Sequence, residues 1–333
     1  MAKVLLQPGL FPLEWRPPTT RGVADAVKAG GRDALPDPDR RADQATYQQV
    51  RCRSALNRAT GMPFKWTLNP YRGCTHACHY CYARRYHAQF ELGAGDDFAS
   101  VILVKVNFPD VLARELARPG WSRELVAVGT ATDPYQPIEG EYRLTRRALE
   151  ALSTAATPVG LVTKGPMVVR DIDVLQALAA QAACSIYLSV PSVDERAWRR
   201  LEPGTAHPLQ RLKAVRRLAD AGLNASVLMA PLLPGITTSK SAIAATVRAI
   251  ADHGARAVGA SVVRLDQGTR EHFLRVLSAE YPHLSEGYER LFARGARQVP
   301  AGYAASVRQT VREAMAMAGI EKSQGRGRDA EEE

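Results

Sequence analysis

Short apolar runs alternate with helical stretches along most of this chain of 333 residues, about six times in succession. Strands that are apolar throughout are covered on both faces, which is typical of a parallel sheet. A complete eight-unit β/α barrel needs about 250 residues. The sequence therefore predicts an α/β fold with an open or partial barrel, and a doubly wound sheet stays open as the alternative. The expected strands are 64–68, 101–106, 125–128, 159–163, 185–190, 225–229 and 257–263.

The two ends of the chain differ in composition from this repeat. Residues 17–47 are rich in Pro, Gly, Asp, Arg and Ala, which predicts an irregular arm. Residues 323–333 hold no apolar residue except Ala330 and predict a solvated tail. We expect an N-terminal extension (1–60), a core (61–275) and a helical C-terminal extension with a disordered tail (276–333).

Charge and hydropathy limit the partners of the chain. The formal net charge of +10 allows a polyanion such as nucleic acid, but Arg-rich chains are as often basic without such a partner. No apolar run of 18 residues or more is present, so no membrane span is expected. The first residues lack a signal-peptide core, which favours the cytoplasm.

Three of the five cysteines lie in one short segment, with the spacing C-x3-C-x2-C at Cys74, Cys78 and Cys81. In the cytoplasm, clustered cysteines indicate a metal site rather than disulfides. Three thiolates on one loop can hold an iron–sulfur cluster and leave one iron without a protein ligand. The alternative is a structural zinc site, which needs a fourth ligand such as His76, His79 or Cys52. Cys52 and Cys184 have no cysteine neighbours, and we expect both to be bystander thiols.

Together with Tyr80 before the third cysteine, this spacing resembles the cluster signature of the radical S-adenosylmethionine (radical SAM) superfamily. The resemblance implies a partial (β/α)6 TIM-like barrel with the cysteine loop after its first strand. It also implies a [4Fe–4S] cluster on Cys74, Cys78 and Cys81 that binds S-adenosylmethionine. An electron, supplied by a reductant of the flavodoxin or ferredoxin type, would then cleave the sulfonium and give a 5′-deoxyadenosyl radical.

The segments 69–73 and 81–84 beside the cysteines resemble the subgroup related to spore photoproduct lyase, often labelled DNA repair photolyase. By this resemblance Thr132, Lys164 and Ser189, at the ends of three strands, are the expected contacts to S-adenosylmethionine. Active sites of β/α barrels lie at these strand ends. Lys164 would neutralise the carboxylate, since a charge that ends a buried strand needs a partner. The alternative is a loop lysine and two capping hydroxyls.

Several charged residues near these segments allow two interpretations each. Glu202 and Arg211 lie in a stretch that also resembles the subgroup, and they either shape the rim of the site or form a surface salt bridge. Arg72, Arg84 and Arg85 either balance an anionic cluster or belong to a solvated loop. Residues 196–217 carry seven Arg or Lys, a candidate basic helix face or a solvated one.

The sequence also departs from the pattern of the family. The usual Gly-Gly-Glu at the second strand end is replaced by the segment 129–132, and Thr130 stands where spore photoproduct lyase has a hydrogen-donating cysteine. A threonine hydroxyl is a poor hydrogen-atom donor, which argues against the spore photoproduct reaction. We therefore expect a radical SAM enzyme of unknown substrate, with nucleic acid as a candidate and the catalytic side chains unassigned. The second hypothesis is a non-catalytic iron–sulfur or zinc protein that binds nucleic acid.

Overall fold

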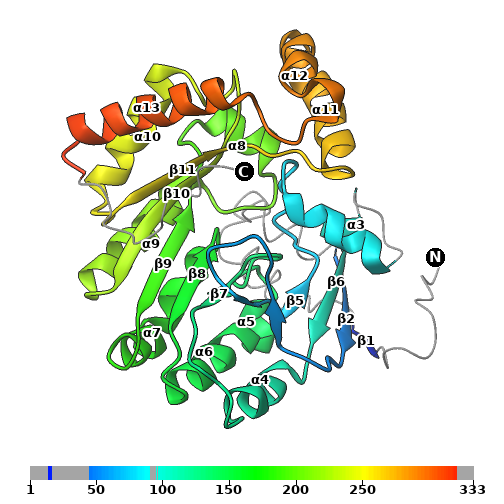
Figure 1. Ribbon diagram of the computed structural model, residues 1–333, viewed down its shortest axis with the longest axis vertical. Coiled ribbons are helices and arrows are strands. Elements are labelled where there is room, and N and C mark those ends of the chain that lie inside the picture. Colours follow the sequence, from blue (N-terminus) through cyan, green and yellow to red (C-terminus); the bar gives the residue numbers. More distant parts are fainter. Residues whose placement is uncertain (1–13, 17–44, 91–94, 96, 321–333) are drawn as a thin grey trace, which may run out of the picture.

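The computed structural model describes residues 14–16, 45–90, 95 and 97–320, and a seven-stranded sheet lies at its centre (Figure 1). The strand order is β11–β10–β9–β8–β7–β4–β3. The strands from β4 to β11 run parallel, and β3 pairs antiparallel with β4 at one edge. They are β3 (Leu56–Arg58), β4 (Trp66–Leu68), β7 (Val126–Val128), β8 (Val159–Thr163), β9 (Cys184–Ser189), β10 (Asn224–Leu232) and β11 (Val258–Val262).

Helices connect successive parallel strands and line the outer side of the sheet (Figure 1). In the described part of the chain the edge strands β3 and β11 do not pair with each other, so the sheet does not close. Six parallel strands in an open sheet confirm the predicted partial barrel. The connecting helices are α4 (Phe108–Leu116), α5 (Glu139–Tyr142), α6 (Leu144–Thr154), η3 (Pro166–Asp171), α7 (Ile172–Ala179), α8 (Glu195–Leu201), α9 (Pro208–Asp220) and α10 (Lys240–Asp252).

The main hydrophobic core lies between this sheet and its helices. Leu68, Leu161 and Val227 on the strands are fully buried, and Leu149 and Leu212 meet them from the helices. Burial of one such side chain stabilises the fold by about 1.5–3 kcal/mol. The strands of this sheet are the apolar runs from which the sequence predicted a parallel sheet covered by helices.

A second, four-stranded sheet has the order β1–β2–β6–β5, with β1 (Glu14–Arg16), β2 (Thr46–Val50), β5 (Tyr71–Arg72) and β6 (Val101–Lys105). The predicted strand 101–106 is therefore real, but its assignment to the β/α repeat is wrong. It pairs with β2 and β5 instead of with the main sheet. The first crossover, between β4 and β7, is long enough to contribute β5 and β6 to this sheet, whereas β1 and β2 come from the segments before β3. Because β5 directly precedes the cysteines, the small sheet anchors the start of their loop.

The C-terminal helices pack onto the main core and onto a second buried cluster near the cysteine loop. They are α11 (Thr269–Glu280), α12 (Ser285–Leu291) and α13 (Ala301–Met317). Phe273 and Tyr288 share a buried cluster with Cys78 and Tyr80, so the helices after β11 cover one side of the cysteine loop. The predicted boundary at residue 275 falls inside α11.

Parts of the predicted extensions lie outside the described residues. This holds for the arm up to residue 44 and for the tail 323–333. The division into three segments stays a prediction. None of the helices that the structure describes is both long enough and apolar enough to cross a membrane.

Candidate active site

The cysteine loop, residues 73–81, follows β5 and turns sharply twice. Gly73 and Ala77 have φ angles of 82° and 54°, in the left-handed region. Gly73 meets this requirement without strain because it lacks a Cβ atom. The amide of Cys74 donates to the carbonyl oxygen of Phe98 at 2.9 Å, and that of Cys81 donates to the carbonyl oxygen of Cys78 at 3.2 Å. The backbone thus brings the three cysteines onto one compact loop.

The three thiols are free, with Cys74 and Cys78 buried and Cys81 half-buried. Burial raises the pKa of all three, that of Cys78 to about 12, and the charges of Cys78 and Cys81 further raise the pKa of Cys74. Among the described residues no three His, Cys, Asp or Glu side chains form a group that could hold a metal ion. An iron–sulfur cluster is a different case, because each cysteine binds a separate iron and the metal stabilises the thiolate. Three neighbouring free thiols without disulfide partners fit such a cluster.

Arg84 holds the cysteine loop from inside. Its side chain is 1% exposed, and its guanidinium donates to the carbonyl oxygens of Cys78 at 3.0 Å, Ala77 at 2.8 Å and Gly95 at 2.7 Å. The interpretation of Arg84 as part of a solvated loop is therefore wrong. Its planar, forked group thus ties two carbonyl oxygens of the loop together from the buried side.

The segment after α8 packs against the other side of the loop. The amide of His79 donates to the carbonyl oxygen of Leu201 at 3.0 Å, and that of Gly204 donates to the carbonyl oxygen of His76 at 3.1 Å. A Cβ atom on Gly204 would lie 2.0 Å from the carbonyl oxygen of Thr75. Only glycine fits at this contact, so the position of the loop depends on it.

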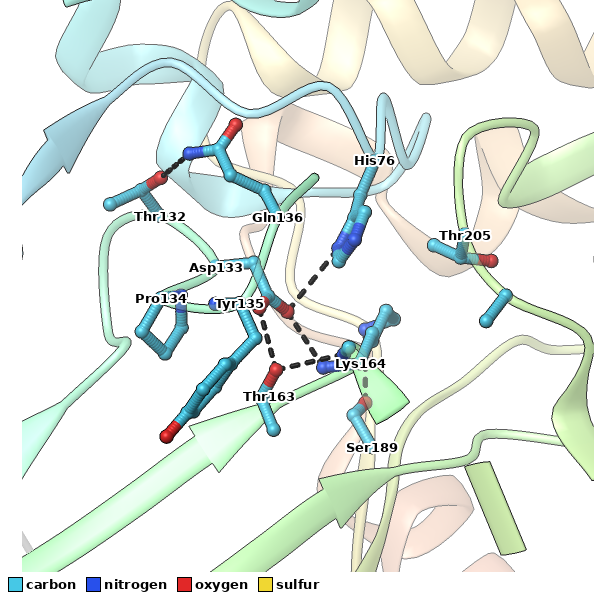
Figure 2. A network of polar contacts seen from close by, with 12 residues as sticks. His76, Thr132, Asp133, Pro134, Tyr135, Gln136, Thr163, Lys164, Ser189 and Thr205 are labelled. Carbon is cyan, nitrogen blue, oxygen red and sulfur yellow. Dashed lines mark hydrogen bonds and ion pairs between the residues drawn. The ribbon is translucent and has the colours of Figure 1, made fainter. Parts of the chain in front are cut away.

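The carboxylate of Asp133 joins the end of β7 to the cysteine loop and to β8 (Figure 2). It accepts from the Thr163 hydroxyl and from the Lys164 amide, both at 2.6 Å, and lies 3.2 Å from Nδ1 of His76. Burial opposes the charge of Asp133, but His76 and these donors outweigh it and lower its pKa to about 2. Nδ1 of His76 is thus paired with the Asp133 carboxylate at the end of the strands.

Thr132 is buried beside Asp133 and supports the loop. Its hydroxyl donates to the carbonyl oxygen of Gly73 at 2.7 Å and accepts from the Gln136 amide at 3.1 Å (Figure 2). Gln136 also accepts from the amide of Thr75 at 3.2 Å. Both hydrogen-bonding functions of the Thr132 hydroxyl are thus engaged within the protein.

Lys164 and Ser189 meet at the ends of β8 and β9 (Figure 2). The Lys164 ammonium donates to the Ser189 hydroxyl at 2.9 Å, and this hydroxyl donates onward to the carbonyl oxygen of Ala230 at 3.0 Å. The ammonium also lies 5.6 Å from the ring centroid of Tyr80. Burial works to lower the pKa of Lys164, but the charges of Cys78 and Glu202 outweigh burial and raise it. The group therefore stays cationic next to the thiols.

Glu202 and Arg211 form a buried ion pair, so the alternative of a surface salt bridge is wrong. Glu202 is 4% exposed and Arg211 0%. Arg211 also donates to the carbonyl oxygens of Ala206 at 2.8 Å and Ser189 at 2.9 Å. Tyr80 donates its hydroxyl to the same carboxylate. Burial works to raise the pKa of Glu202, but Arg211 and Lys164 hold it below its usual value.

The predicted basic helix over 196–217 is two helices, α8 and α9, joined by the segment that packs on the cysteine loop. Arg211 is buried, and Arg200 pairs with Glu280 at 3.2 Å, so the seven basic residues do not share one face. Arg85 pairs with Asp266 at 2.8 Å and is 39% exposed. Cys184 is buried and Cys52 is half-buried, both outside the cysteine loop.

Two contacts to the loop come from α11, which the sequence did not single out. The Thr269 hydroxyl donates to the carbonyl oxygen of Cys81 at 3.1 Å, and ring nitrogens of His79 and His272 lie 2.9 Å apart. Neither α11 residue lies in a motif that the sequence analysis used. No local pattern could have linked them to residues almost 200 positions earlier.

The cysteine loop and the strand ends lie within a segment that a sequence family describes. The family model of the radical SAM superfamily matches residues 68–247, more than half of the chain. The chain belongs to the radical SAM superfamily. It is thus an enzyme that acts through S-adenosylmethionine, and the hypothesis of a non-catalytic metal protein is wrong. The superfamily implies an iron–sulfur cluster, which the three free thiols fit.

Relatives of this radical SAM enzyme give little further detail. An uncharacterized protein of Mycobacterium tuberculosis is 38% identical over 272 residues, which cover 81% of this chain and 80% of the relative. A radical SAM Nalpha-GlyT isomerase of Pseudomonas phage M6 is 27% identical over 172 residues, or 51% of this chain and 33% of that protein.

Solved structures of spore photoproduct lyase share the fold. The complex with dinucleoside spore photoproduct has a TM-score of 0.63 and 18% identity, and it covers 84% of this chain and 82% of the lyase. A lyase variant with bound AdoMet and the dinucleoside has a TM-score of 0.62. At this identity the likeness concerns the fold, and it confirms the expected similarity to the lyase.

Proposed function

We propose that Cys74, Cys78 and Cys81 bind a [4Fe–4S] cluster and that the iron without a protein ligand binds S-adenosylmethionine. The bound cluster would supply the electron for reductive cleavage to methionine and a 5′-deoxyadenosyl radical. The observation that carries this proposal is the Lys164 ammonium, 14% exposed, which lies 5.6 Å from the ring centroid of Tyr80 on the loop that holds the three free thiols. A cation in that place stabilises thiolates and an incoming carboxylate alike.

Lys164 has the donors that a carboxylate needs. Among the described residues the Lys164 ammonium donates to the Ser189 hydroxyl, and its nearest acid oxygen, on Glu202, lies 3.9 Å away. An ammonium has three N–H groups, so donors remain for a ligand. We propose that Lys164 binds the carboxylate of S-adenosylmethionine. Ser189 would then lie next to the bound carboxylate, because its hydroxyl accepts from Lys164. Thr132 would border the ligand site while its hydroxyl binds the carbonyl oxygen of Gly73.

The reductant is proposed to be a small electron carrier of the flavodoxin or ferredoxin type. Radical SAM chemistry consumes one electron for each cleavage, and the described part of this chain shows no second cysteine group that could form another cluster. The electron therefore comes from outside the chain.

A nucleic-acid substrate is proposed on the basis of charge. The formal net charge is +10, and two exposed arginines lie on neighbouring segments, Arg264 after β11 and Arg297 before α13. Arg297 lies 3.6 Å from Asp266, which also pairs with Arg85 beside the cysteine loop. Arginine binds phosphate through a planar, forked group. A phosphate backbone would therefore find cations next to the expected radical.

The cluster proposal is tested by anaerobic reconstitution with iron and sulfide, followed by reduction with dithionite in the presence of S-adenosylmethionine. We expect 5′-deoxyadenosine from the wild type and none from Cys78→Ala. Cys52→Ala is the matched control, because it removes a thiol outside the loop and should leave the product unchanged. A Cys78→Ala variant that forms the product, or zinc in a wild type that takes up no cluster, would overturn the proposal.

The substrate proposal has its own measurement, fluorescence anisotropy with single- and double-stranded DNA and with RNA. Affinity should fall steeply between about 50 and 200 mM salt. Arg264→Ala should weaken binding to all sequences and lower the salt slope by about one, whereas Arg312→Ala on α13 should not. Absence of binding to all three at about 50 mM salt would rule out this substrate class.

A further inference from the structure

A buried group of charges surrounds Lys164, and its acid is Glu202. The carboxylate of Glu202 serves two cations, Lys164 at 3.9 Å and Arg211 in direct contact. These three side chains are 14% exposed or less. Among these three side chains one negative charge faces two positive charges. The group therefore carries an excess positive charge before the cysteines bind a cluster or an anionic ligand binds.

The two oxygens of Glu202 have separate tasks. Oε1 accepts the Tyr80 hydroxyl and faces Lys164. Oε2 accepts from Arg211 and lies 3.4 Å from the Thr205 hydroxyl. One oxygen is thus directed at the cysteine loop and the lysine, and the other fixes the carboxylate to α9 and to the turn after α8.

Arg211 also connects Glu202 to Ser189, the other partner of Lys164. Besides Glu202 it binds the backbone oxygen of Ser189, whose hydroxyl accepts from Lys164. The ammonium of Lys164 is thus held between a hydroxyl and a carboxylate that Arg211 fixes together. A flexible four-carbon side chain needs such restraint to present its donors in one direction.

We propose that Glu202 is a positioning residue for S-adenosylmethionine binding, which holds the Lys164 ammonium in place next to the cysteine loop. Glu202 acts through Lys164 and does not contact the ligand. The inference rests on the proposed function, because it takes the carboxylate of S-adenosylmethionine as the ligand of Lys164.

The test measures anaerobic binding of S-adenosylmethionine to the reconstituted protein without reductant, so that no turnover occurs. Iron and sulfide per chain are measured for each variant. Lys164→Met should raise Kd about tenfold or more. Glu202→Gln should raise it about tenfold in the wild-type background and by less than about twofold in the Lys164→Met background.

Glu202→Gln leaves two buried cations without an acid, so this variant can fail to fold. Glu202→Asp keeps the negative charge, but its side chain is one methylene shorter, so the carboxylate lies farther from Lys164. If Glu202 positions Lys164, Asp should also raise Kd at unchanged iron content, again only when Lys164 is present. If Glu202 merely balances charge, Asp should restore wild-type affinity.

Glu139→Gln is the matched control, because Glu139 is a buried acid that also binds a tyrosine hydroxyl and an arginine. It should leave Kd unchanged in the folded protein. Equal losses from Glu202→Gln or Glu202→Asp in both Lys164 backgrounds would overturn the proposal. A wild type that takes up the cluster and yet does not bind S-adenosylmethionine would overturn the proposed ligand itself, before any Glu202 variant is compared.

Discussion

Two buried networks in this enzyme are built from the same three residue types and differ in charge. In one, Glu202 binds Tyr80 and Arg211. In the other, Glu139 binds Tyr71 and Arg170. Both carboxylates are buried, and both tyrosines lie on or beside the segment that carries the cysteines.

The surroundings separate the two networks. Glu139 also accepts from the backbone amides of Thr145 at 3.0 Å and Arg146 at 3.2 Å. A second buried acid, Asp171, pairs with both Arg170 and Arg146. Arg146 also pairs with the exposed acids Asp173 at 2.6 Å and Glu150 at 3.1 Å. Every arginine of this network therefore has at least one acid, and no cation is left in excess.

The Glu202 network holds one acid and two cations instead. A balanced network needs no ligand and links elements of the fold, here β5 to η3 and α6. An unbalanced one next to free thiols favours an anionic ligand. We therefore assign a structural role to the Glu139 network and a ligand-binding role to the Glu202 network.

Loss of the balanced network should have the largest effect on stability. Glu139→Gln removes one of the two acids that face Arg170 and weakens the link from β5 to η3 and α6, so the free energy of unfolding should fall by about 3 kcal/mol. Chemical denaturation of the protein measures this change. An unfolding free energy within about 0.5 kcal/mol of the wild type would show that Glu139 is not a structural link.

Loss of the excess cation, Lys164, should affect ligand binding strongly and stability only slightly. Lys164→Met removes a positive charge while Glu202 keeps Arg211, so the free energy of unfolding should change by less than about 1 kcal/mol. Kd for S-adenosylmethionine should rise about 10- to 100-fold. Denaturation and equilibrium binding on the same preparation check both numbers. A strong loss of stability with unchanged Kd would reverse the assignment of the two networks.

Gly204→Ala tests whether the Glu202 segment sets the position of the cysteine loop. The new Cβ would lie 2.0 Å from the Thr75 carbonyl oxygen, so the loop must shift. We expect a loss of about 1–3 kcal/mol in stability and less iron per chain after reconstitution. Gly302→Ala on α13 is the control, since a Cβ there meets nothing within 4 Å. Full iron content in Gly204→Ala would show that the loop is placed independently.

Lys105 is a half-buried cation that lies near another cation, Arg72, and it extends the comparison to a charge without an acid among its main neighbours. Burial, with the nearby Arg72, lowers its pKa from the usual 10.5 to about 8. Because the unfolded chain binds more protons between these values, native stability should rise with pH from about 8 to 10.5. Lys105→Met should stabilise the protein by about 1 kcal/mol at pH 7, despite the lost hydrogen bond to the Asn69 carbonyl oxygen. This gain should shrink over the same pH range, and a gain that stays constant would contradict the shift.

The sequence predicted the main sheet because its strands are apolar throughout and each is followed by a helix. It assigned 101–106 to the wrong sheet because a β-branched run has the same pattern in either one. The three cysteines and Lys164 could be found from spacing and position at a strand end. These features are local, and a single sequence displays them directly.

The rest of the site depends on the tertiary fold. Arg84 and Arg85 are adjacent in sequence, yet Arg84 is 1% exposed and Arg85 39%. The burial of Glu202 with Arg211 could not be separated from a surface pair, because burial depends on α8, α9 and the cysteine loop together. Thr269 reaches the Cys81 carbonyl oxygen across 188 residues. Contacts of this range leave no local pattern.

The most direct test of the central claim is the electron paramagnetic resonance spectrum of the reconstituted enzyme that is equilibrated with increasing S-adenosylmethionine, then reduced and frozen at once, before cleavage. A ligand on the open iron alters the spectrum of the cluster. The wild type and Glu139→Gln should change at the same concentration, and Lys164→Met should need about 10- to 100-fold more. A Lys164→Met spectrum that changes at the wild-type concentration would contradict the assignment of the excess charge to S-adenosylmethionine.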